Sequence, residues 1–198
     1  LLGWWCAFAS RMLENWRQRR LDDELDAAWA THGPVVVDGE STVVADGMWH
    51  NPNHFLRLRL FIEALSQQGA EFRLLGVLRT RADKRERRAL ERIGFHEFIY
   101  IDEDEELTTD GFLAEAEHLL SQVASHADML DIRLPHGLPA YVVYDTVLKN
   151  ARDPQPPINH PLWRKTLAQT LRNLAIYTRE FEQRKVTHCP CCALRTYI

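Results

Sequence analysis

Glycine, proline and cysteine are scarce in this chain of 198 residues, with nine, nine and four copies. So little glycine and proline excludes a collagen-like fibre, and a hydrophobic content of 45% excludes an intrinsically disordered chain. Four cysteines are too few for a disulfide-dense miniprotein. No apolar run approaches the roughly 20 residues that a membrane-spanning helix needs. The formal net charge of −4 gives no global basic field, so we predict no nucleic-acid partner.

The cysteines are also unevenly spread. Cys6 stands alone, whereas Cys189, Cys191 and Cys192 fall within the last ten residues. A secreted disulfide framework distributes its cysteines along the chain, so this pattern favours a reducing, cytoplasmic location. The apolar patch at residues 1–9 lacks the basic n-region of a signal peptide. We expect it to pack on the core, with peripheral association at the inner face of the membrane as the alternative.

Hydrophobic periodicity predicts strands that alternate with helices. Helices are expected over 11–30, from about residue 54 to Gly69, and over 83–93, 111–125 and 139–150, followed by a long one beyond Pro161. Strands are expected over 34–38, 71–78, 95–101 and 129–134 and from Val186, with 41–45 as a further strand or a turn. This order predicts the α/β class: a Rossmann-like three-layer αβα sandwich with a mainly parallel sheet. We divide the chain into an N-terminal helical extension, 1–33, and a Rossmann-like domain, 34–198.

Several nucleotide and hydrolase motifs are missing. No G-x-G-x-x-G follows the Val35 strand, so the dinucleotide fingerprint is absent. There is no G-x-x-x-x-G-K-[ST] of a P-loop and no G-x-S-x-G of an α/β-hydrolase. We therefore predict no bound cofactor.

The strongest candidate site is the segment from Asp46 to His54, which contains His50, two asparagines and Gly47. Ligands of open α/β sheets bind where strand ends lead into helices. Gly47 permits close backbone approach, His50 and His54 titrate near neutral pH, and the helix start after Asn51 attracts anions. Asn51 or Asn53 acting as a simple helix cap is the structural alternative.

A second candidate runs from Leu134 to Asp145. His136 and Gly137 are expected at a strand-to-helix junction, where a turn often contains glycine. Tyr144 and Asp145 follow in the next helix; the alternative to ligand binding is a packed tyrosine beside a solvated carboxylate.

Three charged or soft-ligand clusters favour structural interpretations. The basic residues between Arg79 and Arg88 alternate with acidic ones, as on a solvated helix face. The acidic run 102–106 is expected to face water. The Cys189–Cys192 cluster has no partner pair upstream in the sequence, so we predict no metal site.

Two stretches resemble a known family. Val36-Val37-Asp38-Gly39 leading into Asp46-Gly47-Met48-Trp49, and the Gly137–Asp145 segment continuing as Thr146-Val147-Leu148, resemble bacterial glycosyltransferase-like proteins of capsular and surface polysaccharide biosynthesis. The resemblance covers about residues 35–186. It implies the acceptor-side, N-terminal half of a GT-B glycosyltransferase, with a glycan acceptor and a nucleotide-sugar donor gripped mainly by a second domain. After His188 the sequence departs from the family pattern, and we expect a truncated or frameshifted chain that is inactive alone.

The resemblance and the candidate segments together yield a hypothesis for the chemistry. His50 or His136 would take the proton of the attacking sugar hydroxyl, and Asp46 would orient that histidine or the sugar. Two alternatives stay open. One is a non-catalytic α/β module that binds a protein or a glycan, with the two candidate segments apart. The other is a hydrolytic Rossmann enzyme that uses Asp38 with Asp46.

Overall fold

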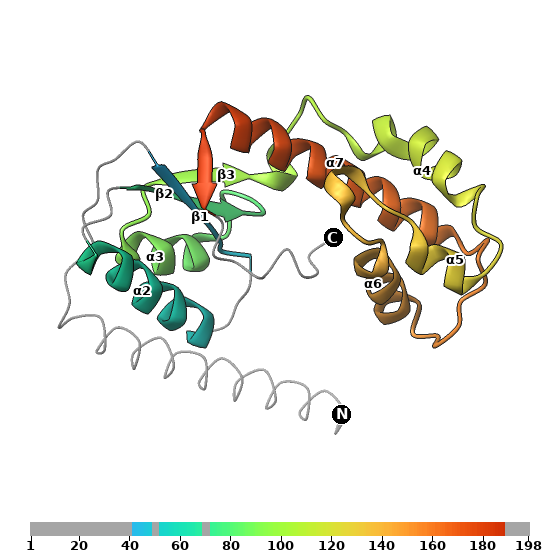
Figure 1. The fold of residues 1–198 in the computed structure, drawn as a ribbon, viewed down its shortest axis with the longest axis horizontal. Coiled ribbons are helices and arrows are strands. Elements are labelled where there is room, and N and C mark those ends of the chain that lie inside the picture. Colours follow the sequence, from blue (N-terminus) through green and yellow to red (C-terminus); the bar gives the residue numbers. More distant parts are fainter. Residues whose placement is uncertain (1–40, 49–51, 69–71, 189–198) are drawn as a thin grey trace, which may run out of the picture.

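The computed structural model describes residues 41–48, 52–68 and 72–188 of the chain. Within them a parallel sheet and a group of helices are joined by one long helix (Figure 1). The strands are β1 (Ser41–Asp46), β2 (Phe72–Leu78), β3 (Glu97–Tyr100) and β4 (Val186–His188), in the order β3-β2-β1-β4. All neighbouring strands are parallel, so their carboxyl ends meet at one edge.

Two helices connect these strands. α2 (Pro52–Gln67) links β1 to β2, and α3 (Lys84–Ile93) links β2 to β3. Gly94 ends α3 in the left-handed conformation, with φ of 119°, and its amide donates to the carbonyls of Leu90 and Glu91. This is the helix stop that the sequence predicts at Gly94.

Side chains on the strands alternate between two packed clusters, as the period of two requires. Val43 and Ala45 pack with α2 and α3, in a cluster that includes Phe55, Leu58, Ile62, Leu90 and Ile93. Val44, between them, packs instead with Leu75, Val77, Ile99 and Ile176. The parallel sheet is therefore buried on both faces, consistent with its apolar strands.

The remaining helices form a second core. They are α4 (Leu113–Leu120), α5 (His126–Asp131), α6 (Tyr141–Ala151) and α7 (Pro161–Gln183), with short 3₁₀ turns at Ile101–Glu103, Thr109–Phe112 and Pro135–Gly137. The first half of α7 contributes Trp163, Leu167 and Leu171 to this core, and its second half contributes Ile176 to the sheet cluster. α7 therefore ties the helices to the sheet, as Figure 1 shows.

Most elements agree with the sequence-based expectations, and one does not. The strand expected over 129–134 is wrong: α5 covers His126–Asp131, and Arg133 forms an isolated bridge with Pro139. Ser125 and Asp128 form a capping box that starts this helix, a local signal stronger than the short apolar run. His136 and Gly137 consequently follow a helix rather than a strand. The expected strand at 34–38 and the extension 1–33 lie outside the described residues.

Candidate functional site

Asp46 ends β1 at the carboxyl edge of the sheet, and the residue is 8% exposed. One carboxylate oxygen, Oδ1, accepts the backbone amide of Met48 at 2.7 Å. This local turn is typical of aspartate after a strand, because the short side chain reaches the amide two residues ahead. The carboxylate is thus held at the strand end where α/β folds bind ligands.

His54 reaches back from the start of α2 to the same residue. Its Nε2 lies 2.7 Å from the backbone oxygen of Asp46. A carbonyl oxygen only accepts, so Nε2 carries the proton and Nδ1 is the basic nitrogen of the neutral ring. The ring also packs edge-on against Phe55, with centroids 5.5 Å apart. This hydrogen bond therefore links the start of α2 to the end of β1.

The electrostatics at this edge involve three residues. Burial raises the pKa of the Asp46 carboxyl above its ordinary value, and the Met48 amide and the charges of His54 and Arg79 offset only part of that rise. Arg79 follows β2 directly, next to the end of β1. Its charge therefore acts at this edge and not on the solvated helix face that the sequence analysis assigned to it. The signal that would have identified it is its position one residue beyond a predicted strand.

Gly47 has a packing role at this edge. Its amide donates to the carbonyl of Val77 at 2.8 Å. A Cβ on Gly47 would lie 2.6 Å from Leu90 Cδ1 and 2.8 Å from Leu78 Cδ2. Contacts that short force neighbours to move, so glycine is needed for the strand end to pass beneath α3.

The second candidate segment packs against α7 and the helical core. The His136 ring contacts the hydroxyl of Thr178 at 2.7 Å, and its backbone has a positive φ of 61°. Gly137 also has a positive φ, 72°, and the space where a Cβ would sit is open. Among the described residues, no hydrogen bond or ion pair joins His136 to the Asp46 loop.

Tyr144 and Asp145 have separate surroundings although they are adjacent in sequence. The Tyr144 hydroxyl lies 3.0 Å from His126 Nδ1, and its ring packs on Trp163 at 5.5 Å between centroids. Asp145 is exposed and pairs with Lys149 one helical turn on, at 2.6 Å. This arrangement matches the packed tyrosine beside a solvated carboxylate that the sequence left open.

Three residues of the first candidate segment carry less information. His50 and Asn51 lie outside the described residues, and Asn53 lies in the first turn of α2. The structure therefore brings together Asp46, Gly47 and His54 of the predicted residues, and adds Arg79.

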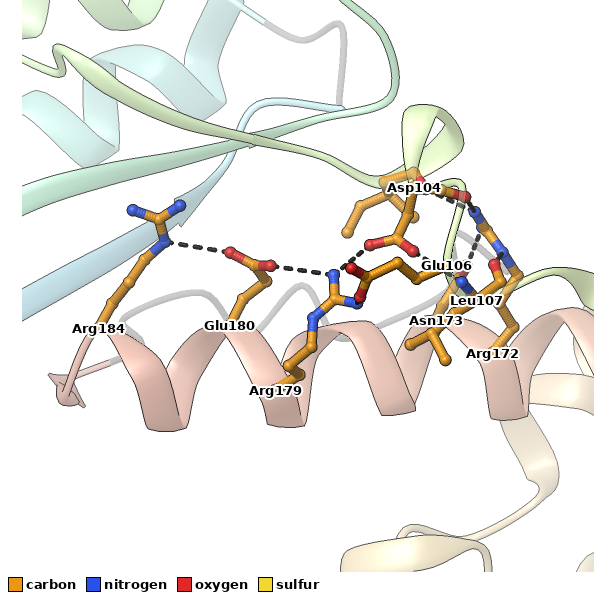
Figure 2. Close-up of polar contacts among 9 residues, drawn as sticks. Asp104, Glu106, Leu107, Arg172, Asn173, Arg179, Glu180 and Arg184 are labelled. Carbon is orange, nitrogen blue, oxygen red and sulfur yellow. Dashed lines mark hydrogen bonds and ion pairs between the residues drawn. The ribbon is translucent and has the colours of Figure 1, made fainter.

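Four residues of the acidic run 102–106 are exposed, as expected, and only Asp104 is half-buried. Figure 2 shows this loop wrapped around two arginines of α7. The buried guanidinium of Arg172 donates to the backbone oxygens of Ile101, Asp104 and Leu107, and that of Arg179 pairs with the carboxylates of Asp104 and Glu106. The loop thus supplies hydrogen-bond acceptors to the buried guanidinium of Arg172. The sequence gives no sign of this contact, because Arg172 lies about 70 residues away in the chain.

Two hollows occur in the part of the molecule that contains α7. One, of about 870 Å³, lies beside the start of α7 and is lined by residues that include Leu113, Leu120, Ile158, His160 and Lys165. The other, of about 400 Å³, lies next to Pro135 and Thr178. Pro135 of the second candidate segment lines the smaller hollow, whereas none of the candidate site residues lines the larger one.

No protein-family model, curated protein or solved structure matches this chain. Within the described ranges, no three His, Cys, Asp or Glu residues gather closely enough to hold a metal ion. In the same ranges, no helix combines the length and the apolar character needed to cross a membrane.

Proposed function

We propose that this chain is the acceptor-side half of a glycosyltransferase-like protein of surface polysaccharide biosynthesis, with its ligand edge at Asp46. The observation that supports the proposal most is the convergence of Asp46, His54 and Arg79 at the carboxyl ends of β1 and β2. A carboxylate, a histidine and a guanidinium suit the hydroxyl and phosphate groups of sugars and sugar phosphates. We also propose that the whole chain has a Rossmann-like three-layer fold. Its support is the burial of both faces of the sheet.

The proposed chemistry is proton removal from an acceptor hydroxyl. Of the two histidines named as base, His136 is held against Thr178, whereas His50 follows Asp46 by four residues. His50 is therefore the proposed base, because four residues span less than about 15 Å. Asp46 orients the acceptor and His54 holds the loop that carries His50. A nucleotide-sugar donor would be gripped mainly by a second domain, in the cytoplasm at the inner face of the membrane.

One observation favours a second candidate, a non-catalytic α/β module that binds a glycan or a protein. His136 contacts Thr178, so the second candidate segment is held on α7. The glycosyltransferase hypothesis needs this segment and the Asp46 loop in one cleft, and within the ranges that the structure describes His136 makes no contact that joins them. This candidate needs only the Asp46 edge as a binding surface. It predicts glycan or protein binding without any chemistry on a donor.

Saturation-transfer NMR on the purified chain tests the proposed ligand edge, with nitrophenyl hexosides and UDP-glucose as probes. We expect signals from a hexoside that are lost in Asp46→Asn and retained in Asp145→Asn. Asp145→Asn is the matched control, since it removes an exposed carboxylate from α6. Equal signals from both variants would overturn the ligand edge. Release of UDP by the full protein, abolished in His50→Ala, separates transfer from simple binding.

A further inference from the structure

An apolar stripe is exposed on the outer face of α2. Leu56, Leu60 and Phe61 are 39%, 57% and 38% exposed, and they are three of the five large exposed hydrophobic residues in the described part of the chain. Leu56, Leu60 and the exposed Ala64 follow one another at intervals of four, so they line one side of the helix. The opposite side, with Phe55, Leu58 and Ile62, packs on the sheet. α2 is therefore apolar on two faces, although only one of them meets the sheet.

We propose that this stripe is the docking face for the chain's own N-terminal segment, residues 11–30. The segment 11–30 joins the fold close to this face. Residue 40 precedes Ser41, which begins β1 at the amino edge of the sheet. α2 starts after the carboxyl end of β1 and ends before Phe72 begins β2, so its last turn lies at that same amino edge. The chain thus enters the sheet beside the end of the stripe.

The lengths also allow this docking. α2 has 16 residues, or about 24 Å of helix, and 20 residues of helix over 11–30 would measure about 30 Å. The intervening residues 31–40 span at most about 35 Å when extended. A helix over 11–30 can therefore lie along the whole of α2 without strain in the connection.

Pattern and charge also favour this docking. Leu21, Leu25, Ala28 and Trp29 recur at helical intervals, which gives this segment an apolar face to bury. At helical spacing Asp22 and Glu24 flank that face, whereas Asp23 and Asp26 lie on the far side of the segment. The exposed charge next to Leu56 on α2 is that of Arg57. The two faces are thus apolar along the centre and opposite in charge at the margin.

Tryptophan fluorescence and limited trypsin digestion test this docking. Four of the six tryptophans, Trp4, Trp5, Trp16 and Trp29, lie in the first 30 residues. We expect Leu56→Lys with Leu60→Lys to shift the emission to longer wavelength by several nanometres. The same variant exposes Arg17, Arg19 and Arg20 to trypsin at least tenfold faster. Leu130→Lys is the matched control, because Leu130 on α5 is 42% exposed and is expected to change neither reading.

A change on the segment itself gives a second, independent test. Leu25→Lys leaves α2 intact and is expected to reproduce both effects, with unchanged far-ultraviolet circular dichroism over the sheet and helices. Unchanged emission and digestion in both Leu variants would overturn the proposal. A dimer in sedimentation would also overturn it, if the protection of Arg17–Arg20 from trypsin disappears when the dimer is diluted. A second copy of the chain would then cover the stripe. Co-sedimentation with phosphatidylglycerol vesicles that is abolished by Leu60→Lys would assign the stripe to a membrane surface instead.

Discussion

The guanidinium of Arg179, on α7, pairs with the carboxylate of Asp104, in the loop after β3 (Figure 2). The side chains of Arg179 and Asp104 are 26% and 10% exposed, so the pair is largely removed from water. Arg179 also pairs with Glu180, which in turn accepts from Arg184 at 3.2 Å. The chain of charges runs along α7 and ties it to the carboxyl edge of the sheet. Because α7 carries residues of the helical core and of one sheet cluster, this pairing couples the helical core to the sheet.

Replacing Arg179 is expected to destabilise the fold. Arg179→Met keeps the aliphatic stem but leaves Asp104 and Glu180 as partly buried carboxylates, at a cost of about 1–3 kcal/mol. Arg81→Met is the control, because Arg81 is 75% exposed in its pair with Glu103 and its loss should change stability by less than about 0.5 kcal/mol. Urea unfolding at neutral pH measures both. Equal midpoints for the two variants would show that the Arg179 pairs do not hold α7 in place.

The stability contributed by Asp104 should depend on pH. Burial raises its pKa, but the hydrogen bonds from Arg179 and Leu107 and the charges of Arg179 and Arg172 outweigh burial and hold the pKa below its ordinary value. A lowered pKa in the folded state gives stability that is present above the unfolded value of about 4 and is lost as pH falls through the folded value. We expect Asp104→Asn to be less stable than the parent at pH 7, with a gap that narrows as pH falls below about 4. Urea midpoints across this range measure the gap, and a gap that does not narrow on acidification would contradict the prediction.

Asp46 should show the opposite sign. Burial raises the pKa of its carboxyl, so the unfolded chain ionises first and the charged group lowers stability as pH rises from about 4 through the folded pKa. Asp46→Asn retains an oxygen for the Met48 amide and is expected to raise the free energy of unfolding at pH 7 by about 1 kcal/mol or less. The gain should vanish at pH 3. Thermal unfolding at both pH values tests this, and a variant destabilised at pH 7 would show that the carboxylate is a structural group.

A side chain at Gly47 is expected to destabilise the fold. In Gly47→Ala the new Cβ meets Leu90, Leu78 and the carbonyl of Val77, so Leu90 and Leu78 must move at a cost of about 1–3 kcal/mol. Gly111→Ala is the matched control, because its Cβ would approach Thr108 only to 3.8 Å. Chemical denaturation of both variants gives the comparison. A Gly47→Ala protein as stable as Gly111→Ala would mean that α3 can shift away from β1.

The sequence by itself determined the local elements of this protein. The periodic apolar face of α2 and the stop at Gly94 each depend on neighbours in the chain, whereas residues 41–45 are equally consistent in sequence with a strand or a turn. These signals are short-range, because side-chain period and backbone freedom act within one or two turns. The same reasoning found Asp46 and His54 in one segment that the structure closes with a hydrogen bond. It failed at 129–134, where the Ser125 cap decided between helix and strand.

Only the tertiary structure decided which distant groups meet. The acidic loop 102–106 is largely solvated, as its sequence predicts, yet Asp104 and nearby backbone oxygens contact Arg172 and Arg179, which lie on α7 more than 60 residues later. The charge of Arg79 acts on Asp46 for a similar reason, since parallel pairing of β1 and β2 aligns two strand ends that are 32 residues apart in sequence. Burying a guanidinium is favourable only when several oxygens converge on it, and that convergence depends on how the elements pack. The periodicity of one chain segment contains no information about which segment will supply those oxygens.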